Sequence, residues 1–197
     1  MLEATLQHIE RYAAAHLDAR PHARECAIAI ARHMLAPTET LLFEFELQRR
    51  RGKSLGLALA VAAIARAAHD ARRAYSMRVL SLSRRQSGKA AAVVLTILAQ
   101  MGVPNAGLNE ARVRLVSGTT ITFSPFRAAP VPLASDGMLE EFVFIDESCF
   151  IDAHVLCKIL GERAHVACVT TPTRESAARK RGLFRCERGY GVETACL

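Results

Sequence analysis

The chain has 197 residues and a formal net charge of +7, and 51% of its residues are hydrophobic and 23% charged. This composition is that of a globular protein and excludes a disordered one, and the length suits one domain with a substantial core. Because the longest apolar run (residues 55–65) is too short to cross a bilayer and the N-terminus does not resemble a secretory signal, we expect a soluble, intracellular protein with no membrane segment.

The first 40 residues are predicted to form a helical segment, with helical apolar spacing in CAIAIARHML (26–35), and Pro37 ends it. The alternating, phenylalanine-rich LLFEFEL (41–47) predicts a strand, and LGLALAVAAIARAAHDARR (55–73) predicts the helix after it. SMRVLSL (76–82) and SGKAAAVVLTILAQM (87–101) predict a second strand and a second helix.

The middle of the chain predicts shorter elements. Residues 113–125 predict a β-hairpin or two short strands, and the proline-containing residues 127–137 predict a loop. EFVFIDES (141–148) is an apolar run of the buried-strand type that ends in two acids. DAHVLCKIL (152–160) predicts a helix, and HVACVTTPT (165–173) predicts a buried strand that runs into a threonine-rich turn.

Strands that alternate with helices predict an α/β fold with a mainly parallel sheet and helices on both of its faces. Ligands bind such sheets at the carboxyl ends of the strands. Four polar stretches each follow a predicted strand directly, at residues 48–54, 83–90, 146–148 and 170–173. We therefore expect these stretches to lie along one edge of the sheet and to form a single site.

Arginine supplies most of the positive charge, in clusters such as RRRGK and ARKRG. A basic face suits a polyanion such as DNA, and a GC-rich genome is the other explanation for the arginine content. The six cysteines contain no C-x-x-C pair. This favours reduced, buried thiols over a metal site.

The first polar stretch, QRRRGKS (48–54), has the composition of a phosphate-binding loop. A glycine, a lysine and a hydroxyl residue between a strand and a helix place backbone N–H groups against phosphate oxygens. Lys53 is then expected to reach the β- and γ-phosphates, and the Ser54 hydroxyl to bind Mg²⁺. The usual pattern begins with a glycine where this chain has Leu47, so a basic surface loop stays an alternative for these residues taken alone.

A near-copy, RRQSGKA (84–90), follows the second predicted strand. Ala90 replaces the hydroxyl residue, so no side chain at that place can hold a metal. Arg84, Arg85 and Lys89 at the start of a helix are candidates to contact a phosphate, for example that of DNA. A solvated basic turn is the alternative.

The acid pair Asp146-Glu147 ends the apolar strand in the Walker B arrangement. Asp146 is expected to hold Mg²⁺ through water, and Glu147 to orient and deprotonate the attacking water. Two carboxylates at the end of a buried strand are costly without a cation or donors near them. After the next strand, VTTPT (169–173) offers hydroxyls that can sense the γ-phosphate: Thr170, Thr171 and Thr173.

Together these motifs resemble the ATPase half of large terminase subunits, the viral DNA-packaging motors, and among these the herpesvirus type looks most similar. QRRRGKS is similar to the family's deviant Walker A loop, which lacks the first glycine and has an arginine three residues before the glycine of GK[ST]. FVFIDESCFI (142–151) is similar to its acid motif, and VTTPT to its coupling motif. The resemblance covers roughly residues 41–173 and identifies QRRRGKS, not RRQSGKA, as the nucleotide loop.

The resemblance implies a P-loop ATPase domain over residues 41–197 that uses ATP and Mg²⁺ to translocate double-stranded DNA into a preformed capsid. Arg49 would be the arginine finger beside Lys53 and Glu147 in catalysis, with Arg50 as an alternative. The implied partners are a portal and other terminase subunits in a homo-oligomeric ring, in the host nucleus if the protein is herpesvirus-like. The nucleotide loop would consist of Gln48, Arg49, Arg50, Arg51, Gly52, Lys53 and Ser54, with Asp146 and Ser54 holding the metal.

The chain departs from this family in two respects. We recognise neither the family's nuclease domain nor an adenine-binding motif before Leu41. A helicase-like P-loop ATPase stays an alternative, and it should carry further helicase motifs and a second motor lobe. A non-catalytic, basic DNA-binding protein is the other alternative, although the chain keeps the lysine, serine and two acids that turnover needs.

Overall fold

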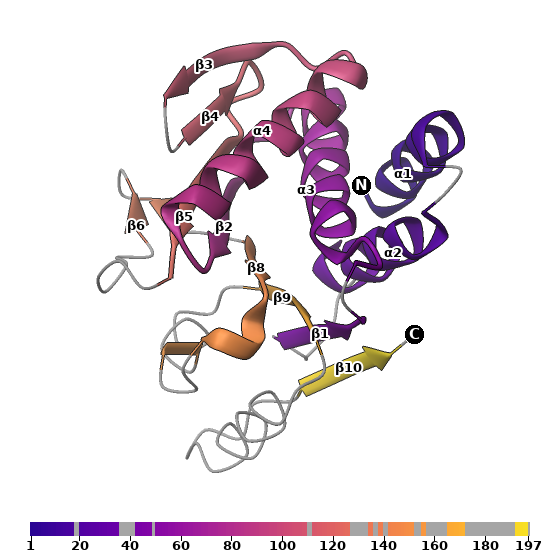
Figure 1. Cartoon of the computed structure of the whole chain (residues 1–197). Helices are drawn as coiled ribbons and strands as arrows, with labels where there is room; N and C mark the ends of the chain where they lie inside the picture. The colour runs from indigo at the N-terminus through magenta and orange to yellow at the C-terminus, as the bar shows by residue number, and fades with distance from the viewer. Residues whose placement is uncertain are drawn as a thin grey trace.

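The computed structural model describes residues 1–17, 20–35, 42–48, 50–109, 112–126, 134–135, 138–139, 142–151, 155–156, 165–171 and 192–196. Within these ranges the chain forms an eight-stranded sheet with helices packed against it (Figure 1). The sheet is mainly parallel, which confirms the predicted α/β class. No helix of the described part is long and apolar enough to cross a membrane.

Three of the four long helices of the described residues pack against one face of the sheet, and the first of the four packs on the next two. The four are α1 (Leu2–His16), α2 (Pro21–Leu35), α3 (Lys53–Asp70) and α4 (Arg84–Gln100). Figure 1 shows α3 in the middle, with α1 and α2 on one side of it and α4 on the other. α3 is buried along most of its length, because its many alanines let three helices and the sheet approach it closely.

Eight strands of the described residues form the large sheet. They are β1 (Leu42–Glu46), β2 (Ser76–Ser81), β3 (Asn105–Asn109), β4 (Arg112–Leu115), β5 (Thr120–Pro125), β8 (Phe142–Asp146), β9 (His165–Thr170) and β10 (Val192–Cys196). β6 (Ala134–Ser135) pairs with β7 (Met138–Leu139) in a separate two-stranded ladder, and a 3₁₀ turn, η1 (Ser148–Phe150), follows β8.

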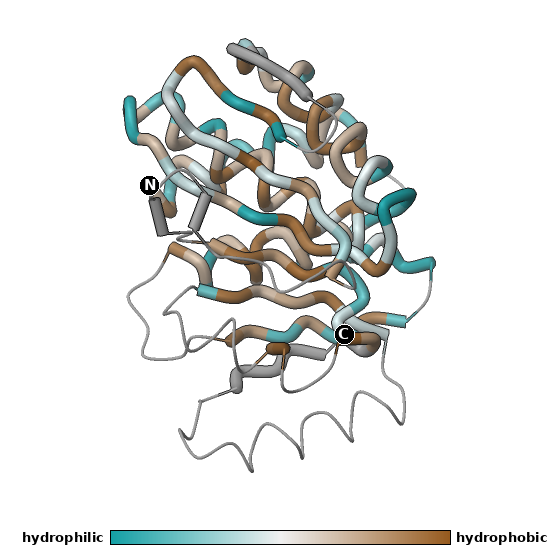
Figure 2. The backbone as a smooth tube through the Cα atoms, turned by 90° about the vertical axis from the view of Figure 1, so that its left-hand side faces the viewer, coloured by the Kyte–Doolittle hydropathy of each residue, from teal (hydrophilic) through white to brown (hydrophobic). Residues whose placement is uncertain are grey.

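The alternation of side chains along the strands creates two apolar clusters, one on each face of the sheet. Phe43 and Phe45 of β1 belong to the larger cluster beneath the helices, which also contains residues of α1 and α2. Val143 and Ile145 of β8 belong to the smaller cluster on the opposite face. Figure 2 shows this apolar layer as predominantly brown strands in the middle of the molecule. The division into residues 1–40 and 41–197 stays a prediction.

The order of the strands decides where their ends lie. It is β10-β1-β9-β8-β2-β5-β4-β3, and the six strands from β10 to β5 run parallel. The carboxyl ends of β1, β2, β8 and β9 therefore meet at one edge of the sheet, as expected from the sequence. β9 lies between β1 and β8, so the segment after β9 is flanked by the segments that follow the other two strands.

Several boundaries differ from the sequence predictions. β3 and β10 were not predicted, because NAGLN and VETAC are short and owe their strand conformation to pairing with β4 and β1. α3 and α4 begin at Lys53 and Arg84, earlier than the predicted starts at residues 55 and 87. β6 falls within the predicted loop 127–137, and the predicted helix 152–160 lies largely outside the described residues.

Candidate active site

The first polar stretch forms a tight loop between β1 and α3. Leu47 extends the pairing of β1, since its amide donates to the carbonyl oxygen of Thr170 at 3.0 Å. Two left-handed residues then reverse the chain, Arg50 at φ 64° and Gly52 at φ 89°. A left-handed arginine is uncommon, and such strained residues cluster at functional sites. Because α3 begins at Lys53, the loop directs the unpaired amide groups of the first turn of α3 toward the sheet edge.

The acid pair lies opposite this loop and contacts it directly. The Ser54 hydroxyl donates a hydrogen bond to Oδ1 of Asp146 at 2.9 Å, although the two residues are 92 positions apart. The Nζ of Lys53 lies 2.7 Å from Oε1 of Glu147, and the Lys53 side chain is only 6% exposed. Glu147 is left-handed, at φ 57°, immediately after β8. The structure thus brings the lysine, the serine and both acids together.

Thr171, directly after β9, completes the same cluster. Thr170 and Thr171 are buried, and the Thr171 hydroxyl donates to Oε2 of Glu147 at 3.2 Å. The two oxygens of Glu147 therefore face the phosphate-binding loop and the β9 segment respectively. Arg49 and Thr173 lie outside the described residues, and their predicted roles stay predictions.

The electrostatics of Asp146 suit a divalent cation. Burial raises the pKa of Asp146 above its usual value, and the neighbouring Glu147 charge raises it further, while the Ser54 hydrogen bond and the Lys53 charge act in the opposite direction. A bound cation would relieve the cost of ionising this half-buried carboxylate. Mg²⁺ is held in nucleotide sites by one or two protein oxygens, water and phosphates, so Ser54 and Asp146 fit it. No group of three His, Cys, Asp or Glu side chains in the described part could hold a metal alone.

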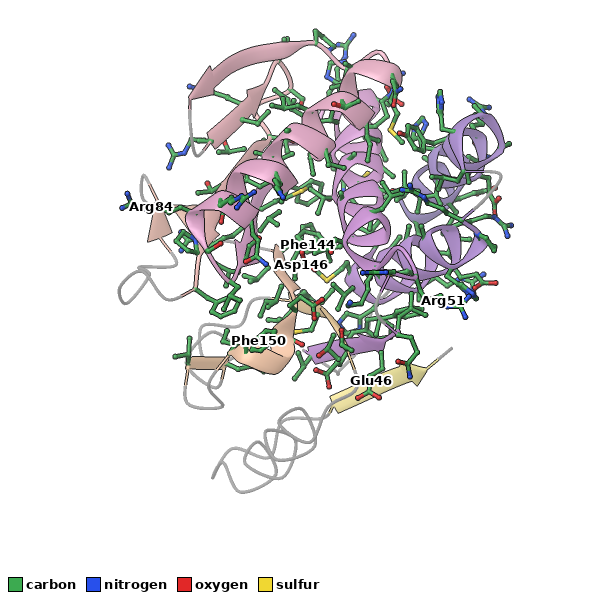
Figure 3. All side chains as sticks on the ribbon, in the orientation of Figure 1. Glu46, Arg51, Arg84, Phe144, Asp146 and Phe150 are labelled. Carbon is green, nitrogen blue, oxygen red and sulfur yellow. The ribbon has the colours of Figure 1, made fainter. Side chains whose placement is uncertain are left out.

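A cleft of about 560 Å³ opens over this cluster. Its lining residues are Arg20, Arg50, Gly52, Lys53, Ser54, Leu55, Gln86, Glu147, Phe150 and Thr171. Figure 3 shows Asp146 in the interior of the molecule, with Arg51 and Arg84 toward opposite sides of it in this view. No role was predicted from the sequence for Arg20, Gln86 or Phe150. Gln86 and Phe150 lie within recognised motifs, whereas Arg20 belongs to the helical N-terminal segment and carries no signal of its own.

The second basic stretch, RRQSGKA, is not a loop. It forms the first turns of α4, and Ser83 caps that helix by accepting a hydrogen bond from the amide of Gln86 at 3.3 Å. The Ser-x-x-Gln pattern of a capping box, residues 83–86, is the sequence signal for this start. Its three cations are exposed, and none of them lines the cleft. Lys89 instead lines an adjoining cavity of about 330 Å³ between α3 and α4.

Comparison with known proteins gives one family and a set of related structures. The sequence model of the family described as "RNA cytidine acetyltransferase NAT10/TcmA, helicase domain" matches residues 46–179. No curated protein matches the sequence.

Three solved structures illustrate the likeness of the fold. The large terminase ATPase domain of Thermus phage P74-26 aligns at a TM-score of 0.56 and 16% identity, over 75% of this chain and 64% of that domain. The large terminase of bacteriophage HK97 aligns at 0.64 and 12% identity, over 99% of this chain and 43% of that one. The large terminase of a thermophilic bacteriophage, in complex with ADP, aligns at 0.61 and 10% identity, over 88% of this chain and 44% of that one.

This chain therefore spans about two thirds or less of those proteins. At such identities the likeness establishes the fold, which is that of terminase ATPase domains and confirms the predicted P-loop NTPase-like architecture. The finer assignment to the herpesvirus type stays a prediction.

Proposed function

We propose that this chain, which belongs to the family of the RNA cytidine acetyltransferase NAT10/TcmA helicase domain, is a Mg²⁺-dependent P-loop ATPase. The observation that carries the proposal is the direct contact of Lys53 with Glu147 and of Ser54 with Asp146, at a cleft that Lys53, Ser54 and Glu147 line. A lysine at a helix start binds phosphate oxygens, and a buried acid beside a serine hydroxyl suits a metal.

Each residue then has a distinct task. Lys53 and the first amides of α3 bind the phosphates, and the remaining loop residues shape the cradle: Gln48, Arg49, Arg50, Arg51 and Gly52. Ser54 and Asp146 would hold Mg²⁺, which neutralises phosphate charge when bound. Glu147 orients the attacking water and accepts its proton. Arg49 is the proposed arginine finger, on the resemblance to terminases alone.

The threonines at the end of β9 and after it are proposed to couple hydrolysis to movement. Thr171 holds Glu147, and it lies between the two halves of the site because β9 is inserted between β1 and β8. A change at the γ-phosphate that moves Glu147 would therefore reach β9 directly. Thr170 and Thr173 are assigned to the same segment as neighbours of Thr171.

Nucleic acid is the proposed partner of the motor. The net charge of +7 suits a polyanion, and Arg84, Arg85 and Lys89 extend exposed cations from the start of α4, next to the cleft. The family match favours a helicase-like ATPase, which was the alternative from sequence. That match covers residues 46–179, a range that includes all the motifs assigned to the site.

Packaging of double-stranded DNA into a capsid is the second candidate. It is favoured by the terminase ATPase domains among the related structures. In that role the chain would work in a homo-oligomeric ring with a portal and other terminase subunits, in the host nucleus if the virus is herpesvirus-like. Duplex DNA would then stimulate turnover more strongly than single-stranded RNA, and the reverse preference would favour the helicase-like role.

The ATPase proposal is tested by three variants. Binding of a fluorescent ATP analogue with Mg²⁺ is measured for the wild type, Lys53→Ala and Glu147→Gln, with Lys89→Ala as a control that removes a nearby lysine from outside the cleft. We expect loss of binding in Lys53→Ala, retained binding without turnover in Glu147→Gln, and wild-type binding in Lys89→Ala. Loss in Lys89→Ala alone, or equal loss of affinity in Lys53→Ala and Glu147→Gln, would contradict these roles.

A further inference from the structure

Arg20 brings a cation from the N-terminal helices into the cleft. It immediately precedes α2, and its carbonyl oxygen accepts the hydrogen bond of the Ala23 amide at 3.1 Å. Its side chain is exposed and lines the cleft together with Lys53, Ser54 and Glu147. It also lines the adjoining cavity between α3 and α4, so it lies where the two spaces meet.

The packing of α2 on the phosphate-binding loop fixes this position. A Cβ placed on Gly52 would lie 3.1 Å from the Cβ of Ala23. A Cβ on Gly56 would lie 2.7 Å from both the Ala23 carbonyl oxygen and the Cys26 Cβ. The two glycines therefore let the first turn of α2 pack directly against the loop and the first turn of α3. Arg20 precedes that turn and is held beside the cleft.

The charges around the cleft leave Arg20 available for an anion. Lys53 is paired with Glu147 at 2.7 Å. Among the described residues, by contrast, no carboxylate forms an ion pair with Arg20. The start of the 15-residue helix α2 adds its own positive potential at the same place. A guanidinium beside a phosphate-binding loop is suited to bind phosphate oxygens.

The residues that line both cavities indicate which phosphate of a bound nucleotide Arg20 could reach. Besides Arg20 they are Ser54, Leu55, Gln86 and Glu147. Ser54 and Glu147 are the groups assigned to the metal and to the attacking water, and both of these face the terminal phosphate. Arg20 shares their side of the cleft.

Resting on the ATPase function proposed above, we propose that Arg20 binds the γ-phosphate of the nucleotide and stabilises its charge during hydrolysis. The N-terminal helices thereby supply part of the nucleotide site. This role is separate from that of Arg49, which belongs to the phosphate-binding loop itself.

The test compares a nucleotide that has a γ-phosphate with one that lacks it. Affinities for fluorescent AMPPNP and for fluorescent ADP, both with Mg²⁺, are measured for the wild type, Arg20→Ala and Arg32→Ala. Arg32 is a matched control, because it is an exposed arginine of α2 that lines neither cavity. We expect Arg20→Ala to weaken AMPPNP binding about 10-fold to 100-fold, the range for losing a hydrogen bond to a charged group, and to leave ADP binding within about 2-fold.

Three outcomes overturn the role of Arg20: unchanged AMPPNP affinity in Arg20→Ala, equal weakening of AMPPNP and ADP, or the same loss in Arg32→Ala. Each of them leaves the ATPase proposal standing as long as the wild type binds nucleotide and Lys53→Ala does not. Failure of the wild type to bind either nucleotide would instead refute the ATPase proposal. Partial recovery of AMPPNP binding in Arg20→Lys would support a phosphate contact, since lysine keeps the charge without the planar fork.

Discussion

The variants Gly56→Ala and Gly88→Ala should change the free energy of unfolding in opposite directions. Both glycines lie inside helices, where alanine is favoured by about 1 kcal/mol through helix propensity. At Gly88 no atom lies within 4 Å of the new Cβ, so the full gain is expected. At Gly56 the same Cβ would lie 2.7 Å from a backbone oxygen of α2 and 2.9 Å from the Cys26 sulfur.

The size of the effect at Gly56 follows from what surrounds it. Overpacking a buried site costs about 1–3 kcal/mol, and the upper part of that range applies because a backbone carbonyl cannot rotate away. After the gain in propensity, Gly56→Ala should lose about 2 kcal/mol, which leaves the two variants about 3 kcal/mol apart. In a chain of this length, that difference corresponds to about 6–12 °C in melting temperature.

The stability of both variants is measured by thermal unfolding, followed by circular dichroism, and by urea titrations at one temperature. Because Gly56→Ala displaces α2 and Arg20 with it, AMPPNP affinity should also fall in this variant and stay unchanged in Gly88→Ala. Equal stabilisation by the two substitutions would refute the close packing of α2 on α3. A destabilised Gly56→Ala with wild-type AMPPNP affinity would refute the link between that packing and the cleft.

Three further predictions concern groups buried near the site. Burial raises the pKa of Asp146, so the stability that its protonated form contributes is full below the unfolded-state pKa and is lost as pH rises through the folded-state pKa. Asp146→Asn should therefore be more stable than the wild type at neutral pH without Mg²⁺. In urea titrations at about pH 4 and pH 8, the free energy of unfolding should depend less on pH in Asp146→Asn than in the wild type. Ser148→Ala should lose about 1–3 kcal/mol in thermal unfolding, because the buried Ser148 hydroxyl donates to Glu44 at 2.9 Å and its loss leaves that buried carboxylate one donor short. The Cys26 and Cys168 thiols are buried, and burial raises the pKa of both, that of Cys168 to about 12. Both thiols should therefore resist maleimide in the native protein and react with it in urea, which mass spectrometry would detect.

The sheet edge was predictable because its signals are local. The strand at residues 42–46 alternates, the strand at 142–146 is continuously apolar, and each is followed at once by polar residues. Parallel strands bring their carboxyl ends together whatever their order, so these polar segments could be expected to lie close to one another without knowing the topology. The contacts of Lys53 and Ser54 with the acid pair follow from that geometry.

What the sequence could not show depends on distant packing. β10 is a strand because it pairs with β1, near the other end of the chain, and nothing in VETAC specifies that partner. Arg20 reaches the cleft only because Ala23 packs on two glycines of a distant segment. The start of α4, by contrast, could have been predicted from the sequence, because Ser83 and Gln86 form a recognisable capping pattern.

The ion pair between Lys53 and Glu147 gives the lysine of the cleft a counter-charge. Lys53 is almost fully buried, and a buried ammonium without a partner would be costly. Glu147 supplies that partner while its other oxygen is held by Thr171. Under the proposed ATPase function, a nucleotide bound to Lys53 through its phosphates would replace Glu147 as the counter-charge and would release the carboxylate proposed to act as the base. Phosphate binding would therefore be linked to activation of the base through one side-chain exchange, which the hydrogen bond between Thr171 and Glu147 would pass on to β9.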